Sequence, residues 1–382
     1  MKLVILTEII SPYRIPVFNA LAKQTDIQLH VIFLADTDPT QREWLVYKSE
    51  IQFSYQVLPS WRRRYWERNI LLNRGLTAAL EQSSPEVILC GGYNYIASWQ
   101  AMAWARKRHV PFLAWVESTA NDKRGGHALI EFLKKKFIAN CSAFVVSGKS
   151  STEYVREFNV PPESIFVAPN AVDIEFFSHG SDQARMRAIA HRQRLQMPQR
   201  FFLYVGRLVE DKGVFDLLAA YGNLTQSLKD EVGMVFVGNG PAKAALMAQA
   251  AKLGSGVVKF PGFVQKEELP CYYALAEACV LPTYTDTWGL VVNEAMACGL
   301  PVIVTHAAGC ARDLVKENWN GLLIRARCPG ELAAALESIA KNPDLRWTMG
   351  QHSRERIMQY SPQSCAGGIA EAAMSFGTPH HA

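Results

Sequence analysis

The 382-residue sequence has no apolar run of about 18 residues, the length that a helix needs to span a bilayer. Its opening apolar segment is short and is interrupted by Glu8, and no small-residue cleavage site follows, so we do not expect a secretory signal. Neither sign of charge is in large excess, because 40 basic and 35 acidic residues give a net charge of only +5. These absences predict a cytoplasmic protein and exclude the strongly basic surface of most nucleic-acid-binding proteins.

Cysteine pairs with the spacing of a metal or redox site are also lacking. The eight cysteines form no Cys-x-x-Cys pair, and several lie in apolar segments such as Ala276–Leu281. This pattern favours reduced core thiols over disulfides or zinc ligands. We therefore predict neither a redox centre nor a structural metal.

The sequence does contain short apolar runs that alternate with longer amphipathic ones. Its length, with 49% hydrophobic and 20% charged residues, fits two domains of ordinary size. The alternation predicts parallel strands in a sheet that helices cover on both faces. In the first half, strands are predicted at Lys2–Thr7, Ile27–Phe33, Val87–Leu89, Pro111–Trp115, Ala143–Ser147 and Ile165–Ala168, and helices at Ile15–Lys23, Leu71–Gln82 and Ser150–Phe158.

The same pattern restarts in the second half of the chain, after a polar stretch that predicts an interdomain connection. We expect an α/β chain of two doubly wound Rossmann-like domains facing a cleft, at residues 1–175 and 176–360. Residues 176–199 form the expected linker, and a C-terminal helix within 361–382 is expected to pack back on the first domain. Strands are predicted at Phe201–Val205, Met234–Val237, Val257–Pro261, Cys279–Leu281, Pro301–Thr305 and Gly321–Ile324.

A loop with two cations follows the predicted strand Phe201–Val205. In this loop Gly206 and Gly213 bracket Arg207 and Lys212, ahead of an apolar helix. A guanidinium and an ammonium at the carboxyl end of a strand are suited to neutralising a diphosphate. The alternative is a solvated loop with a surface ion pair.

Two carboxylates eight residues apart accompany a later predicted helix, at about Gly289–Cys298. Asp286 precedes this helix and Glu294 lies within it, while Gly299 favours its end. The N–H groups at the start of the helix suit a phosphate or a sugar hydroxyl, and both carboxylates are acceptors for hydroxyl groups. The alternative is an N-cap aspartate and an exposed helical glutamate.

With these motifs the sequence resembles the family-four retaining glycosyltransferases of GT-B fold. In that family an acidic residue precedes x-Phe/Trp-Gly, four residues and Glu-Ala, and a Gly-x-Pro-Val stretch follows; residues 286–304 match this pattern. The family's Gly-Arg-Leu-x-x-x-Lys-Gly element matches residues 206–213. Further matches stand in family order at Pro169–Asp173, Val237–Pro241 and Pro261–Val264.

The resemblance implies that the second domain binds a nucleotide-sugar donor. Arg207 and Lys212 would contact the diphosphate, Glu294 the ribose hydroxyls, and Asp286 the O3/O4 edge of the sugar. Asp286 departs from the family, which usually has Glu there, so the sugar contact is expected to shift. The implied catalytic residues are Arg207, Lys212, Asp286 and Glu294, and the implied donor-binding residues are Gly206, Gly238, Phe263, Val264, Trp288, Gly289, Leu290 and Glu294.

The first half looks like a bacterial subset of this family with a Pro-Tyr-Arg and a Trp-x-Glu-Ser element, here Pro12–Arg14 and Trp115–Ser118. Arg14 and Glu117 are therefore predicted to line the acceptor side of the cleft, although Arg14 is equally suited to a structural ion pair. The loop at residues 119–127 suggests Arg124 and His127 as further acceptor contacts. The alternative for this segment is a plain surface loop.

Two cationic stretches also carry apolar side chains. Trp61–Arg68 mixes arginines with aromatic rings, and a predicted helix at His127–Asn140 carries three consecutive lysines. This combination suits an anionic membrane surface, which a lipid-linked acceptor would require. The alternatives are a solvated edge and contact with an anionic acceptor.

The predicted function is retaining transfer of a sugar from a nucleotide sugar, expected to be a UDP-sugar, to a saccharide or lipid-linked saccharide in cell-surface glycan synthesis. Fixed cations stabilise the leaving diphosphate, so neither a metal nor a cofactor is predicted. The expected enzyme is a hexosyl- or N-acetylhexosaminyltransferase in the cytoplasm or at the inner face of its membrane. The alternatives are a nucleotide-sugar epimerase of GT-B fold and a non-catalytic nucleotide-sugar-binding module.

Overall fold

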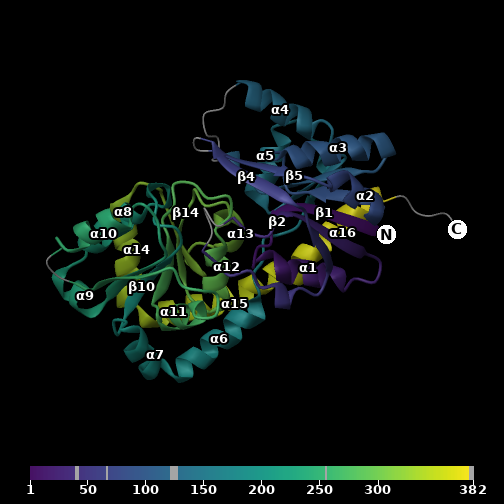
Figure 1. Cartoon of the computed structure of the whole chain (residues 1–382). Helices are drawn as coiled ribbons and strands as arrows, with labels where there is room; N and C mark the ends of the chain where they lie inside the picture. The colour runs from purple at the N-terminus through teal and green to yellow at the C-terminus, as the bar shows by residue number, and fades with distance from the viewer. Residues whose placement is uncertain (39–42, 66–67, 121–127, 254–255, 378–382) are drawn as a thin grey trace. The chain divides into compact units, whose positions relative to one another are not determined.

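The computed structural model describes residues 1–38, 43–65, 68–120, 128–253 and 256–377. The chain divides into two compact units, which we describe separately (Figure 1). Unit 1 consists of Met1–Asn170 and Pro362–Ala382, and unit 2 consists of Ala171–Ser361. Each unit is built on a parallel sheet with helices around it, which confirms the predicted α/β class with two Rossmann-like domains.

The sheet of unit 1 is parallel throughout and has the order β3-β2-β1-β6-β7-β8-β9. Its central strands are buried because their residues are apolar on both faces, as parallel sheets between two helical layers require. The strands are β1 (Lys2–Ile9), β2 (Gln28–Ala35), β3 (Ser54–Val57), β6 (Val87–Cys90), β7 (Phe112–Val116), β8 (Ala143–Val146) and β9 (Ile165–Val167).

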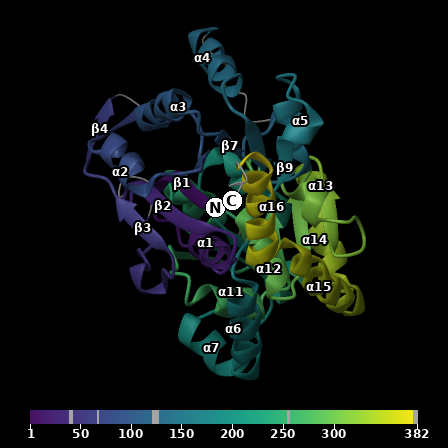
Figure 2. The same cartoon turned by 90° about the vertical axis from the view of Figure 1, so that its right-hand side faces the viewer.

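The last helix of the chain, α16 (Pro362–Phe376), belongs to unit 1 and packs against α1 (Arg14–Ala22) and β9 (Figure 2). The approach is close: a Cβ added at Gly368 would lie 2.1 Å from the carbonyl oxygen of Val167. Both ends of the chain therefore contribute to the core of the same unit. The other helices of unit 1 are α2 (Leu76–Ser83), α3 (Ile96–Arg108), α4 (Ala128–Ile138) and α5 (Lys149–Arg156).

A two-stranded hairpin in unit 1 corrects one sequence prediction. β4 (Ser60–Tyr65) pairs antiparallel with β5 (Arg68–Asn73), so the helix predicted at Leu71–Gln82 begins only at Leu76. Leu71 lies opposite Arg62 in the hairpin register. Its side chain is only 3% exposed because it packs in the core of unit 1. The helix prediction was wrong at residues 71–75 because the sequence of β4 has no alternation of apolar and polar residues, so it gave no sign of a hairpin.

The sheet of unit 2 is also parallel, with the order β12-β11-β10-β13-β14-β15. The strands predicted at Phe201–Val205 and Gly321–Ile324 are confirmed to the residue. The strands are β10 (Phe201–Val205), β11 (Gly233–Val237), β12 (Val258–Gly262), β13 (Ala278–Leu281), β14 (Val302–Thr305) and β15 (Gly321–Ile324).

The boundary between the units lies between Asn170 and Ala171, and residues expected to form a linker are helical parts of unit 2. Asp173 starts α6 (Ile174–Met186) by accepting a hydrogen bond from the Phe176 N–H at 3.0 Å. α6 then packs on α11 (Leu269–Leu275) and α12 (Leu290–Ala297), which explains why it belongs to unit 2. The helices of unit 2 also include α7 (Ala188–Leu195), α8 (Val214–Gly222), α9 (Gln226–Glu231), α10 (Lys243–Ala250), α11 (Leu269–Leu275), α12 (Leu290–Ala297), α13 (Ala311–Leu314), α14 (Pro329–Lys341) and α15 (Pro343–Ile357).

The fold also shows the state of the cysteines and the character of the helices. All eight cysteines are free, and five of them are buried. Within the described ranges, we find no helix whose length and hydropathy would let it cross a bilayer.

Candidate functional site

The strand order of unit 2 reverses direction between β10 and β13. From β10 the chain continues outward through β11 and β12, then returns to place β13 on the other side of β10. At such a switch point the loops after the two strands diverge, and open α/β sheets bind ligands in the crevice that results. The loops that follow β10 and β13 carry the two motifs on which the sequence prediction depends.

Lys212 and Asp286 meet across this switch point. Lys212 ends the short 3-10 helix η4 (Glu210–Lys212) after β10, and Asp286 lies in the loop after β13. The Lys212 Nζ is 2.5 Å from the Asp286 Oδ2, and the two side chains are 25% and 17% exposed. The predicted phosphate ligand and the predicted sugar ligand are thus ion-paired with each other.

Close backbone contacts hold the two loops together. The Tyr284 N–H donates to the Asp211 carbonyl at 2.8 Å, and the Thr283 hydroxyl donates to the same carbonyl at 3.1 Å. Gly213 has φ +66°, and a Cβ there would lie 1.9 Å from the Pro282 carbonyl oxygen, so only glycine fits. Gly213, the last glycine of the Gly-Arg-Leu-x-x-x-Lys-Gly element, therefore lets the segment that carries Lys212 lie close to the loop after β13.

A tight turn connects Asp286 to helix α12. The Asp286 Oδ1 accepts a hydrogen bond from the Trp288 N–H at 3.2 Å, and Gly289, with φ +99°, stands directly before Leu290, the first helical residue. The Trp288 indole is 3% exposed and donates to the Asn293 Oδ1 at 2.8 Å. Trp288 thus packs beneath the turn and supports the exposed face of the site from inside.

The remaining predicted catalytic residues differ in accessibility. Arg207 is exposed, and its side chain makes no hydrogen bond or ion pair with any of the residues that the structure describes. Glu294 is fully buried on α12, where its Oε2 accepts from the Tyr273 hydroxyl at 2.5 Å.

Burial, with the Asp286 carboxylate nearby, raises the pKa of the Cys310 thiol, so this cysteine stays protonated beside the site.

Gly206, Gly238, Phe263 and Val264 follow β10, β11 and β12 at the same edge of the sheet. Gly238 has φ +132°, and a Cβ there would lie 1.9 Å from the Gly206 carbonyl oxygen, which brings the ends of β10 and β11 into direct contact. Phe263 is 37% exposed, whereas Val264 is buried. Phe263 is therefore the side chain of this pair that a ligand at this edge would meet.

Arg14 and Glu117 come together in unit 1, at the carboxyl ends of β1 and β7. The Arg14 Nη2 is 2.8 Å from the Glu117 Oε1, and the Arg14 guanidinium lies 3.8 Å from the centroid of the Trp115 ring. The Asn170 side chain completes this cluster, since it donates to Glu117 at 2.7 Å and accepts from Arg14 at 3.3 Å. The sequence prediction did not single out Asn170, whose only signal was its place in the Pro169–Asp173 match.

One further prediction concerns the basic residues Arg124 and His127 of the first half of the chain. Arg124 and His127 lie outside the described residues. The prediction of metal independence overlooked the triplet Asp36-Thr37-Asp38 after β2, whose Asp-x-Asp spacing can hold a divalent cation. In the structure Asp36 pairs with Lys48 at 2.7 Å and Asp38 pairs with Arg62, so both carboxylates have cationic side chains as partners.

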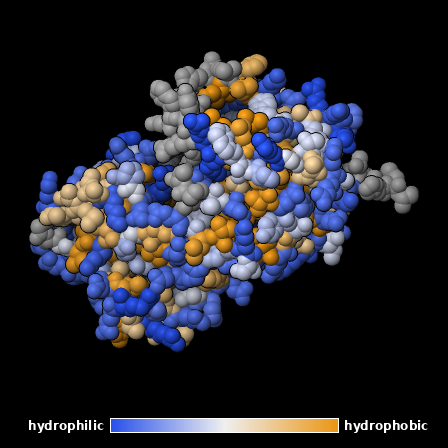
Figure 3. Space-filling view, in the orientation of Figure 1, coloured by the Kyte–Doolittle hydropathy of each residue, from blue (hydrophilic) through white to orange (hydrophobic). Residues whose placement is uncertain are grey.

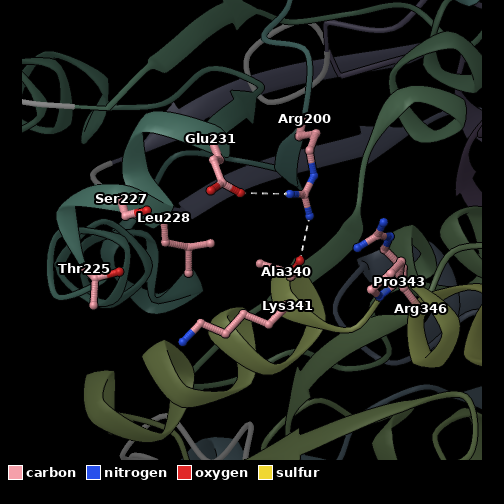
Figure 4. A pocket seen from close by; sticks show the side chains of 9 residues that line it. All are labelled: Arg200, Thr225, Ser227, Leu228, Glu231, Ala340, Lys341, Pro343 and Arg346. Atoms are coloured by element: carbon pink, nitrogen blue, oxygen red, sulfur yellow. Dashed lines mark hydrogen bonds and ion pairs between the residues drawn. The ribbon is translucent and has the colours of Figure 1, made fainter.

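A cavity of about 550 Å³ opens at the opposite edge of the unit 2 sheet, beside Arg200, which precedes β10 (Figure 4). The Arg200 side chain points at Glu231, 3.4 Å away, and donates to the Ala340 carbonyl at 2.6 Å. The Glu277 carboxylate, whose side chain is 11% exposed, joins Arg200 and Arg346 at 3.0 and 2.7 Å. These cations hold the end of α14 in place, and we assign them no ligand.

Sequence comparison finds two family models along the chain. The model "Glycosyltransferase Family 4" matches residues 18–176, and the model "Glycosyl transferases group 1" matches residues 186–356. The curated relatives include D-inositol 3-phosphate glycosyltransferases of Corynebacterium kroppenstedtii, 28% identical over 62% of this chain and 54% of theirs, and of Frankia alni, 28% identical over 72% and 71%. The chain thus spans between about half and 71% of the length of these relatives.

Structure comparison finds the same architecture over nearly the whole chain. Anabaena HepE in complex with UDP aligns with a TM-score of 0.77 at 18% identity and covers 98% of this chain and 100% of that one. Sucrose-phosphate synthase from Thermosynechococcus elongatus aligns with a TM-score of 0.75 at 19% identity, with coverage of 98% and 99%. The chain therefore has the GT-B fold, with a glycosyltransferase family 4 domain followed by a glycosyl transferases group 1 domain.

Proposed function

We propose that the chain transfers a sugar from a nucleotide-sugar donor to an acceptor, and that unit 2 holds the donor. The observation that carries this proposal is the convergence of Lys212, Asp286 and the exposed Arg207 on the switch point of the unit 2 sheet. The sugar nucleotide is expected to be a UDP-sugar, in line with a neighbour of the same fold that was solved with UDP-glucose. The acceptor is proposed to be a saccharide or a lipid-linked saccharide of a cell-surface glycan.

The two cations supply the catalytic effect in this proposal. As the bond between sugar and diphosphate breaks, negative charge grows on the leaving diphosphate, and the Arg207 guanidinium and the Lys212 ammonium stabilise that charge. The proposed reaction retains the configuration of the sugar and proceeds on one face, without a protein nucleophile. The raised pKa of the Cys310 thiol agrees with this, since the cysteine beside Asp286 stays protonated.

Melting-temperature screening with UDP-, GDP- and ADP-sugars tests the donor, because a ligand that binds the native state raises the melting temperature. Slow hydrolysis of the donor or transfer to an acceptor supports the proposal. Isomerisation of the sugar would support an epimerase, and binding without turnover would support a binding module. A donor set that leaves the melting temperature unchanged would argue against all three.

Replacing Arg207 tests the charge argument. Arg207→Ala is expected to lower kcat about 100-fold, which corresponds to about 3 kcal/mol of transition-state stabilisation. The matched control is Arg325→Ala, which removes an exposed arginine of the same unit whose partner is Glu331. Equal activity losses in both variants would contradict a specific role for Arg207.

The acceptor is proposed to lie against the Arg14, Glu117 and Asn170 cluster of unit 1. Glu117→Gln keeps the shape of the side chain but removes the charge that holds Arg14 at 2.8 Å. We expect a higher KM for the acceptor and an unchanged KM for the donor. A change in the KM for the donor alone would contradict acceptor binding by this cluster.

Contact with an anionic membrane is part of the proposal for a lipid-linked acceptor. The hairpin register puts Trp61, Arg63, Ile70 and Leu72 on one face, and Trp61, Ile70 and Leu72 are 53%, 41% and 40% exposed. Apolar residues also gather around α4 in Figure 3, where Phe132 is 61% exposed. Exposed apolar and cationic side chains together favour an anionic lipid surface.

The hairpin also dictates which arginine to mutate. Arg62 points to the other face, is 15% exposed and pairs with Asp38, so its removal would loosen the hairpin itself. Trp61→Ser/Arg63→Ser changes only the outward face. Vesicles containing phosphatidylglycerol should sediment the parent chain more than this variant, and equal sedimentation of the two would contradict membrane contact through the hairpin.

Metal independence is proposed as well and is tested directly. Transfer in EDTA is expected to match transfer with added Mg²⁺ or Mn²⁺. A requirement for either ion would contradict this, and Asp36→Asn/Asp38→Asn would then show whether the Asp-x-Asp triplet is the metal site.

A further inference from the structure

Asp286 has a different partner from the one that the family resemblance implies. Its Oδ2 binds the Lys212 ammonium at 2.5 Å and its Oδ1 binds the Trp288 N–H at 3.2 Å, so each oxygen already has a donor within the chain. We propose that Asp286 is a positioning residue, which acts on the donor through Lys212 by fixing where the ammonium meets the diphosphate. This inference rests on the proposed function and replaces the direct sugar contact for this residue.

The carboxylate is itself held rigidly. Trp288, which donates to it, is buried and anchored by Asn293. The Asp286 carbonyl accepts from the Gly309 N–H at 2.9 Å, and the Cys310 N–H donates to the Trp288 carbonyl at 3.0 Å. A residue fixed at both backbone and side chain is suited to orienting a flexible partner.

Lys212 is such a flexible partner. A lysine ammonium is carried on a four-carbon stem with three N–H donors and no fixed orientation of its own. The structure gives it two acceptors among the described residues, the Asp286 Oδ2 at 2.5 Å and the Thr285 carbonyl at 3.5 Å. One N–H therefore remains for a phosphate oxygen, and its direction is set by the other two.

The departure from the family acid explains why this arrangement forms. An aspartate is short enough to hydrogen-bond the backbone N–H two residues later, which is the geometry of an Asx turn. A glutamate is one methylene longer and does not close this turn. The substitution that is expected to shift the sugar contact thus closes the turn that holds the aspartate carboxylate beside Lys212.

The test uses UDP, which carries the diphosphate but no sugar, and measures its Kd by calorimetry for the full chain. The principal variant is Asp286→Asn, since its amide oxygen still accepts from Trp288 while its NH₂ group, which accepts nothing, faces the ammonium. We expect Asp286→Asn to weaken UDP binding about fivefold when Lys212 is present and less than twofold in the Lys212→Ala background. Asp286→Ala is the second variant, and melting temperatures check that each variant folds.

Several results would overturn the inference. Unchanged UDP affinity with a weakened UDP-sugar affinity would make Asp286 a sugar ligand. If Asp286→Asn binds UDP more tightly than the parent, Asp286 is only an anion that competes with the diphosphate for Lys212. If Asp286→Asn loses the same UDP affinity with and without Lys212, the effect comes from the turn between Asp286 and Trp288. If the parent chain binds none of UDP, GDP and ADP, the proposed function itself fails, which is distinct from these three results.

Discussion

At the scale of single residues, the candidate site depends on close approaches that one atom can block. Gly213 combines a positive φ with a Pro282 carbonyl 1.9 Å from where a Cβ would be. Gly213→Ala is therefore expected to cost at least about 2 kcal/mol of unfolding free energy, from backbone strain and from displacement of the loop. Urea unfolding measures the effect.

Gly330 offers a matched control for that substitution. It lies in the first turn of α14, and nothing lies within 4 Å of an added Cβ. Gly330→Ala should be neutral or stabilise the chain by about 0.5–1 kcal/mol. Similar losses for the two alanines would contradict the steric explanation.

Glu294 supports a second prediction at this scale. Its carboxyl group is fully buried and receives the Tyr273 hydroxyl at 2.5 Å, whereas the Tyr221 hydroxyl donates to the neutral Val232 carbonyl at 3.0 Å. Hydrogen bonds to charged groups contribute about 1.5–3 kcal/mol and neutral ones about 1 kcal/mol. Because the Tyr273 hydroxyl donates to a carboxyl oxygen over the shorter distance, Tyr273→Phe should lower the unfolding free energy more than Tyr221→Phe, as thermal or urea denaturation would measure, and the reverse order would contradict this ranking.

The residues of the site differ in how far the sequence could predict them. Lys212 and Asp286 were identified because their motifs have fixed spacing after predicted strands. Their ion pair was not, because it depends on β13 lying beside β10, which is a property of strand order rather than of either motif. Asn170 was missed for the same reason, since its contacts with Arg14 and Glu117 span distant parts of the chain.

At the scale of elements, apolar strands were predicted well and the polar hairpin was not. Parallel strands buried on both faces read as continuous apolar runs, which explains the agreement for β10 and β15. β4 is Ser60–Tyr65, with three consecutive arginines, so its sequence shows no strand periodicity. It is a strand because Arg62 and Leu71 face the core side while their neighbours face outward.

The attachment of helix α6 to α15 gives a prediction with a pH dependence. Asp182 on α6 accepts from Arg354 on α15 at 3.2 Å, and this hydrogen bond lowers the pKa of Asp182 from 3.8. Because the pKa is lower in the folded state, the pair stabilises the fold above pH 3.8, and the stabilisation is lost as the pH falls through the folded value.

Asp182→Asn tests this attachment. The side chain is half exposed, so the expected loss is only about 0.5–1 kcal/mol at neutral pH. The unfolding free energies of parent and variant should converge well below pH 3.8. A difference that persists in acid would point to a cause other than the carboxylate charge.

At the scale of the whole molecule, unit 2 is continuous in sequence and unit 1 is not. Residues 171–361 contain every strand of one sheet, whereas unit 1 needs α16 from the end of the chain. We predict that a fragment of residues 171–361 unfolds cooperatively by itself, while residues 1–170 alone expose the apolar surface that α16 covers. Circular dichroism melts of the two fragments measure this, and a cooperative melt of residues 1–170 would contradict the stabilising role of α16.

The polypeptide passes between the units twice, after Asn170 and after Ser361. Cleaving the peptide bond at the first passage alone would leave α16 covalently attached to unit 2 while its packing site remains on the other piece. The two pieces would then carry complementary surfaces, so the protein is suited to division at residue 170 into halves that reassemble, with recovery of turnover as the signal.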